Sequence, residues 1–223
     1  VVATGGVQTP FGAGTNGLGS PVTLGANSIL TFYSYNAPAT IAVGSLSSTS
    51  PTAVVHGEGG GPHTINLGGD NTDASYAGVI RDDGSAMSIV KVGSGAQTLT
   101  GASGYTGGTI VNDGTLLVNN TTDSGTGTGA VTVNEGGTLG GEGFITGAVV
   151  INDGGILSPG ASIGDLTAAT VTMEAGAIYN FDIGTSPTNA DSVIVTGDVT
   201  FNGTWEVVLS DGGGGDPQAA DKF

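Results

Sequence analysis

Histidine is the side chain to consider first for chemistry, because imidazole serves as a base and as a metal ligand near neutral pH. The 223 residues contain two histidines, His56 and His63, with Glu58 between them. A zinc site needs three or four ligands in a fixed geometry, and the run of three glycines within residues 57–62 fixes no geometry. We therefore expect two polar residues at a flexible turn, with neither a metal pair nor a catalytic base.

Carboxylate pairs are a second source of chemistry, since two carboxyl groups flank the bond that is cleaved in glycoside hydrolysis. Asp82 and Asp83 are adjacent, so on a strand they would face opposite sides, and a turn accounts for them better. One arginine and two lysines leave few cations to stabilise a negatively charged transition state. The many serines and threonines have no histidine–aspartate partner in a recognisable motif. The sequence predicts no catalytic residue and no enzyme.

Calcium is the one metal that the sequence leaves open, because oxygen ligands suit a hard cation. Asp70, Asn71 and Asp73 lie close together in the segment GGDNTDAS, and Asp211 and Asp216 flank a run of four glycines. Neither segment matches the EF-hand pattern or the glycine-rich nonapeptide repeat. Solvated loop carboxylates account for both segments. Calcium at Asp70, Asn71 and Asp73 is the metal-site hypothesis, and no other cofactor is expected.

Composition indicates an ordered chain with many turns. The sequence contains 44 glycines and no cysteine, yet it is 37% hydrophobic with a mean hydropathy of +0.19, unlike a disordered chain. The formal net charge is -16, with three basic residues against nineteen acidic ones. So few cations argue against nucleic acid as a partner. No run of 18 apolar residues exists, so the sequence predicts no transmembrane segment.

Internal repetition is the strongest signal in the sequence. Each repeat is a short alternating strand, then an asparagine or acidic residue beside glycine, then another short strand; the five segments are 108–118, 129–139, 147–157, 169–179 and 197–207. Asp113, Glu135 and Asp153 occupy the same place in three units, at spacings of 22 and 18 residues. These spacings are close to one coil of a β-helix, so the sequence predicts a β-solenoid.

Corresponding apolar positions should stack coil on coil into a continuous core. The residues expected to stack just before the turn are Val111, Val133, Ile151, Met173 and Phe201. The residues expected to stack just after it are Leu116, Leu139, Leu157, Tyr179 and Trp205. A β-sandwich of ordinary hairpins is the alternative, but sandwich loops have no reason to repeat the same turn residues.

The first hundred residues are less regular but read as further strands. Strands are expected around Asn27, on both sides of the glycine-rich 57–62 segment, and on both sides of Asp82-Asp83-Gly84. No linker or change in composition divides the chain. We therefore expect one domain over residues 1–223, with the clearest repeats at 99–210.

One segment closely resembles a known family. Residues 99–120, LTGASGYTGGTIVNDGTLLVNN, resemble the autotransporter-associated β-strand repeat, with its Tyr-Thr-Gly-Gly-Thr core and its Gly-Thr-Leu strand. The segment ILSPGASIGDLTA at 156–168 is similar to a step found in autotransporter passengers, and the resemblance covers roughly residues 66–210. It implies an all-β, right-handed parallel β-helix that lies on the bacterial cell surface or is released from it. It implies no catalytic residue.

These features predict a structural or adhesive extracellular protein, such as a stalk, a surface-layer element or a filament subunit. A carbohydrate-binding or polysaccharide-cleaving β-helix is the alternative, and exposed aromatics beside carboxylates would favour it. Partners would be surface glycans, other cells or a second copy of the chain. We expect self-association because neither end has the signature of a solenoid cap. The segment 216–223 resembles the start of another strand, so we also expect a fragment of a longer chain.

Overall fold

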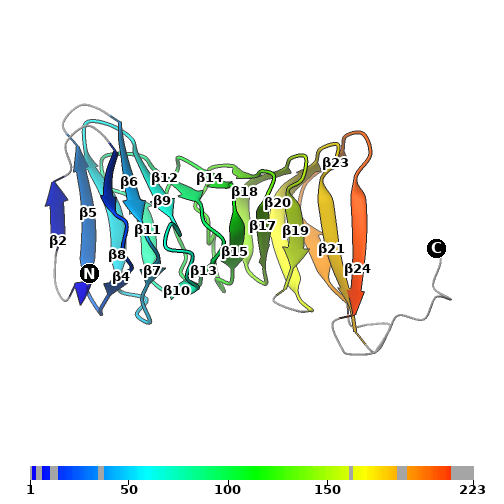
Figure 1. The fold of residues 1–223 in the computed structure, drawn as a ribbon, viewed down its shortest axis with the longest axis horizontal. Coiled ribbons are helices and arrows are strands. Elements are labelled where there is room, and N and C mark those ends of the chain that lie inside the picture. Colours follow the sequence, from blue (N-terminus) through cyan, green and yellow to red (C-terminus); the bar gives the residue numbers. More distant parts are fainter. Residues whose placement is uncertain are drawn as a thin grey trace.

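Parallel pairing between strands of successive coils organises the whole molecule. The computed structural model describes residues 2–3, 7–10, 15–34, 38–160, 163–184 and 190–211. In this part of the chain every pair of neighbouring strands is parallel, and no helix is present. The coils lie one after another along the long axis, with the N-terminal strands at one end and β24 at the other (Figure 1). The prediction of an all-β parallel solenoid is confirmed.

Four sheets run along the sides of the solenoid in the part of the chain described. The long sheet contains β3 (Thr15–Leu18), β6 (Ala39–Val43), β9 (His63–Leu67), β12 (Met87–Lys91), β14 (Thr109–Val111), β16 (Val131–Val133), β18 (Phe144–Ile151), β20 (Asp165–Met173), β22 (Ser192–Val195) and, paired to β20, β23 (Val199–Phe201). The second sheet contains β10 (Ala74–Tyr76), β13 (Ala96–Leu99), β15 (Gly114–Val118), β17 (Gly137–Gly141), β19 (Ile156–Pro159), β21 (Ile178–Ile183) and β24 (Glu206–Asp211). The third sheet contains β2 (Val7–Pro10), β5 (Ile29–Ser34), β8 (Val54–Gly59) and β11 (Val79–Asp82). The fourth contains β1 (Val2–Ala3), β4 (Val22–Leu24) and β7 (Leu46–Ser47).

The cross-section changes along the axis. Coils near the N-terminus contribute a strand to each of three sheets, whereas from β13 onward the coils alternate between the second sheet and the long sheet. The third sheet ends at β11, and the next coil forms no strand beside it. That coil still contacts β11, because Gly104 donates its backbone N–H to the carbonyl of Ile80 at 2.9 Å. This change explains why the first hundred residues look less regular than the repeats. The predicted strand pairs around Asn27, around the glycine-rich segment and around Gly84 are present, with β8 running on to Gly59 within the glycine-rich segment.

The apolar columns form the core. Val111, Val133, Ile151, Met173 and Phe201 occupy one register line of the long sheet, as predicted. The first four are at most 2% exposed. Each coil therefore buries its apolar side chains against the coils on either side, which a single coil could not do alone.

The second column contains one misassigned residue. Leu116, Leu139, Leu157 and Tyr179 share a register line, but the next position is Val207 and not Trp205. The assignment of Trp205 to this line was wrong because it aligned the unit on its glycine. Tyr179 is six positions after Met173, and Val207 is likewise six positions after Phe201.

The repeated turns are closed by glycine and asparagine. Gly114, Gly136 and Gly154 have φ angles of 62°, 87° and 69°, a region that is costly for other residues. The asparagines before these turns form a ladder: Asn134 donates through Nδ2 to Oδ1 of Asn112 at 2.7 Å, and Asn152 donates to Asn134 at 2.7 Å. The recurring Asn-acidic-Gly sequence thus links successive coils as well as turning the chain.

The Tyr-Thr-Gly-Gly-Thr motif at residues 105–109 has a packing role. Tyr105 is fully buried, and its hydroxyl lies 2.6 Å from Oγ1 of Thr109 at the start of β14. A side chain at Gly107 would lie within 2.5 Å of the carbonyl oxygen of Met87 in the preceding coil, so only glycine fits. The motif therefore fixes how this coil enters the long sheet.

Candidate functional site

Asp70, the first of the three calcium candidates, lies in a turn and bonds to the protein. Its Oδ2 accepts a hydrogen bond from the hydroxyl of Ser45 at 2.9 Å. Its Oδ1 accepts from the hydroxyl of Thr72 at 2.9 Å and from the backbone N–H of Thr72 at 3.2 Å. Burial acts to raise the pKa of Asp70, but these hydrogen bonds outweigh it and leave the pKa below its ordinary value. This carboxylate ties one coil to the next.

The other two candidates bond to the following coil, whereas Asp70 bonds to Ser45 of the preceding one. Asn71 has a φ of 60°, and its Oδ1 accepts from the backbone N–H of Ser94 at 2.9 Å. Asp73 Oδ1 accepts from the backbone N–H of Ala96 at 2.7 Å. The structure thus gives all three residues a structural task, and calcium at these positions stays a prediction. In the other acidic segment, Asp216 lies outside the described residues.

His63 is a core residue. It starts β9, fully buried, between Ala39 and Met87 of the neighbouring strands. Among the residues described, neither of its ring nitrogens has a hydrogen-bond partner. Burial lowers its pKa, because a charged imidazolium loses its hydration there. His63 therefore packs as a neutral ring, and its expected place at a flexible turn was wrong.

His56 lies at the centre of a polar cluster on the outer face of the third sheet. It lies between Thr31 and Arg81 in register and is only 5% exposed, so it too is a buried strand residue. Its Nε2 lies 2.7 Å from Thr31 Oγ1, and its Nδ1 lies 2.8 Å from Asp83 Oδ2. Glu58 Oε1 is 3.7 Å from Nε2, and Arg81 Nη2 is 3.8 Å from Asp83 Oδ2.

The order hydroxyl, imidazole, carboxylate in this cluster is the order of a hydrolase triad. A triad also needs a hydroxyl that a substrate carbonyl can reach. Thr31 is 5% exposed in the centre of the sheet, so its hydroxyl is covered. The geometry therefore provides a buried polar network and no nucleophile. We assign no catalytic residue to it.

Asp82 and Asp83, predicted to lie at a turn, separate into two roles. Asp82 ends β11, and its Oδ1 accepts from the backbone N–H of Met87 at 2.7 Å while its Oδ2 accepts from the hydroxyl of Thr106 at 2.6 Å. Asp83 follows the strand and contacts His56. Sequence reasoning missed this contact, although the separation of 27 residues is close to one coil of this region and could have suggested it.

Lys91 is a buried cation, and sequence reasoning assigned it no place in the fold. It is fully buried, and its Nζ donates to the backbone carbonyls of Val92 at 2.8 Å, Gly93 at 2.7 Å and Asp113 at 3.1 Å. Burial lowers its pKa, and the negative charges of Asp113 and Asp70 oppose that shift. The side chain holds together the turns of two coils.

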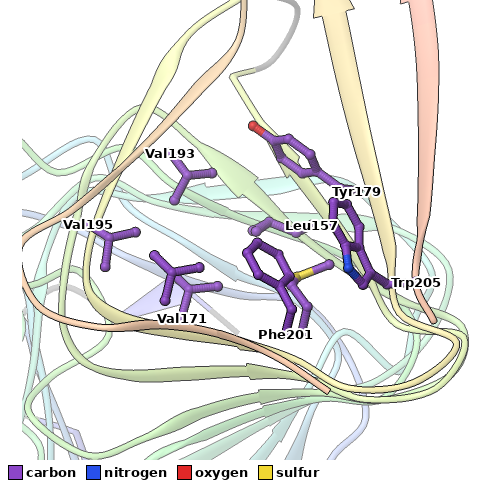
Figure 2. A pocket seen from close by; sticks show the side chains of 9 residues that line it. Leu157, Val171, Tyr179, Val193, Val195, Phe201 and Trp205 are labelled. Carbon is purple, nitrogen blue, oxygen red and sulfur yellow. The ribbon is translucent and has the colours of Figure 1, made fainter. Parts of the chain in front are cut away.

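The C-terminal end of the solenoid carries an apolar pocket of about 220 Å³ (Figure 2). Its lining residues come from the last coils and are Leu157, Val171, Met173, Tyr179, Val193, Val195, Val199, Phe201 and Trp205. The rings of Phe201 and Trp205 stack with centroids 4.7 Å apart, and Phe201 is 52% exposed. The core column of the long sheet thus reaches the surface at this end.

Comparisons with known proteins agree with the repeat pattern. Residues 89–118 match the passenger-associated transport repeat. The chain is 32% identical over 166 residues to the adhesin BmaC autotransporter of Brucella suis biovar 1 (strain 1330). This alignment covers 70% of the chain and 5% of the relative, so the chain spans a small part of that protein's length.

The resemblance expected from the sequence is therefore confirmed: the chain carries a passenger-type autotransporter repeat. Passenger repeats of this kind place the chain at the bacterial cell surface or outside the cell. In the described ranges, no helix is long and apolar enough to cross a membrane.

Proposed function

Because the chain carries a passenger-type autotransporter repeat, we propose that it is a scaffold segment of an adhesive protein on the bacterial surface and that it has no enzymatic activity. The observation that carries the proposal is the use of its polar groups. Hydrogen bonds from one coil to the next are made by Asp70, Asp73, Asp82, Lys91 and the asparagine ladder, which suits a rigid rod. The similarity to a Brucella adhesin supports the adhesive role.

The sides of the rod are the surface offered to a partner, which we propose to be surface glycans or proteins of another cell. In the part of the structure described, the large exposed aromatic side chains are scattered. Tyr33 lies on the third sheet, Phe144 on the long sheet, and Phe201 and Trp205 at the C-terminal end. Such scatter gives less support to a polysaccharide-cleaving groove than to a broad adhesive face.

Adhesion of displaying cells tests this proposal. The chain would be displayed on a non-adherent bacterium, and cells retained on an epithelial layer would be counted against cells that carry the empty display anchor. We expect more retention with the folded chain and a return to background with Ile151→Asp, which disrupts the stack. Background retention with the native chain, or equal retention with both, would contradict the adhesive role.

We further propose that the C-terminal end associates with a second copy of the chain. Strand β24 is the last strand of the second sheet in the described residues, and its Val207, Val208 and Leu209 are 45%, 39% and 45% exposed. A coil from the second copy that pairs with β24 in the same register would cover these apolar side chains with its own. The net charge of -16 opposes packing side by side, which leaves the apolar side chains at the end as the favourable contact.

Sedimentation velocity at increasing protein concentration tests the association. Phe201→Asp should shift the chain to monomer, because it places a charge in the exposed apolar end. Phe144→Asp is the matched control, since Phe144 is 40% exposed on the side of the rod and should leave association unchanged. A native chain that stays monomeric at every concentration would contradict the proposal.

A further inference from the structure

The polar cluster on the third sheet contains a set of metal-ligating groups. His56, Glu58 and Asp83 each offer one ligand atom, and these atoms lie within 4.8 Å of one another. We infer that the third sheet binds a divalent transition metal ion such as Zn²⁺, with Nε2 of His56 and the carboxylate of Glu58 as ligands and with Asp83 orienting the imidazole.

The two ligand atoms are nearly at the distance that zinc requires. Two ligands about 2.0–2.1 Å from a tetrahedral zinc ion lie roughly 3.3–3.5 Å apart. Nε2 of His56 and Oε1 of Glu58 are 3.7 Å apart, so a small movement of Glu58 brings these two atoms to the required separation. The Glu58 side chain is 39% exposed and has room to make it, whereas the His56 ring is held in place by the sheet.

The hydrogen bonds of His56 set the tautomer that metal binding needs. An ionised carboxylate only accepts, so the 2.8 Å contact with Asp83 Oδ2 places the proton on Nδ1. Nε2 then accepts a hydrogen bond from the hydroxyl of Thr31 at 2.7 Å, and Glu58 Oε1 lies 3.7 Å from the same nitrogen. A carboxylate behind a metal-binding imidazole fixes the ring and makes it a better ligand. An ion about 2.0–2.1 Å from Nε2 would lie too close to Thr31 Oγ1, so on binding the Thr31 hydroxyl rotates away and the ion replaces it on the Nε2 lone pair.

The ligand types favour a transition metal over calcium. An imidazole nitrogen suits zinc, copper and nickel, whereas calcium takes oxygen ligands. Glu58 and Asp83 carry two negative charges against the single positive charge of Arg81, so the cluster has a net attraction for a cation. Because two protein ligands leave the remaining coordination positions to water, we expect binding weaker than in a closed structural site.

Titration with zinc chloride, followed by calorimetry and by NMR of the imidazole nitrogens, tests the site. The chain contains only two histidines, so their signals separate cleanly. We expect one zinc ion per chain, with the His56 signals shifted and those of buried His63 unchanged. Shifted His63 signals, unshifted His56 signals, or no heat of binding would overturn the inference.

Variants then separate the roles. His56→Gln and Glu58→Gln should each weaken zinc binding at least tenfold. Asp83→Asn should weaken it about 10–100-fold through the orientation of the ring. His63→Leu is the matched control, because it removes the other imidazole and should leave zinc affinity unchanged. Circular dichroism verifies that each variant is folded, and native affinity in a folded His56→Gln chain would contradict the site.

Discussion

Replacing Ile151 by aspartate should unfold the coils around it. Ile151 is fully buried in the column between Val133 and Met173. Removing a buried isoleucine costs about 2–5 kcal/mol, and an unpaired buried carboxylate adds about 3–5 kcal/mol. The sum of about 5–10 kcal/mol is comparable with the whole stability of a typical domain, about 5–15 kcal/mol. Because coils depend on their neighbours, the loss should spread to the adjacent coils.

Hydrogen exchange read coil by coil measures this effect. Ile151→Asp should remove protection from β16, β18 and β20, and should leave β8 and β9 protected. Thr132→Asp is the control, because Thr132 lies on the other face of β16, between buried Val131 and Val133, and is partly exposed. It should change stability by less than about 1 kcal/mol. Equal loss of protection in both variants would refute the assignment of inner and outer faces.

Three further predictions concern ions and buried charges. The melting midpoint should be nearly the same in EDTA and in millimolar calcium, because the apolar columns form the core without metal; a rise above about 10 °C would instead assign a structural ion to Asp70, Asn71 and Asp73. His63 has a folded pKa below 6.5, so its contribution to stability is complete above pH 6.5 and is lost as the pH falls through the folded value. The unfolding free energy of His63→Leu in urea should therefore depend less on pH than that of the native chain between pH 7 and 5. The same pH dependence in both chains would contradict this. Lys91→Met leaves three backbone carbonyls without their donor and should cost about 1–3 kcal/mol in urea unfolding, so a variant of native stability would show that these bonds contribute nothing.

The repeated part of the fold could be predicted from the sequence for a physical reason. Equivalent positions in stacked coils meet the same environment, so Val111, Val133 and Ile151 repeat their apolar character and Gly114 and Gly136 repeat their turn. The spacing of 18 to 22 residues then gives the register directly. In the last unit the glycine lies two positions after Phe201, whereas Gly176 lies three after Met173, so counting from the glycine misplaced Trp205; the register pairs Val207 with Tyr179.

The polar groups were harder to predict because their partners are a full coil away. The contact between His56 and Asp83 spans 27 residues, and that between Asp73 and Ala96 spans 23. Sequence reasoning placed His56 and His63 together at a glycine-rich turn. In the structure they lie on two different strands: His63 packs in the core from β9, and His56 belongs to the polar network on the outer face of β8. Burial of Lys91 likewise depends on carbonyls of two different turns, and no local pattern indicates it.

Disulfide trapping tests the stacked, in-register solenoid most directly, because the chain contains no cysteine of its own. Thr132 and Val150 are register partners on adjacent strands, whereas Ile110 lies one strand further along the same line. Strands are about 4.8 Å apart, so the first pair falls within the range of about 4.4–6.8 Å between Cα atoms that a disulfide spans, and Ile110 and Val150 at about 9.6 Å do not. We predict rapid oxidation of the Thr132→Cys, Val150→Cys chain and none of the Ile110→Cys, Val150→Cys chain. Oxidation of the second chain at the same rate, or failure of the first, would contradict the stacked scaffold.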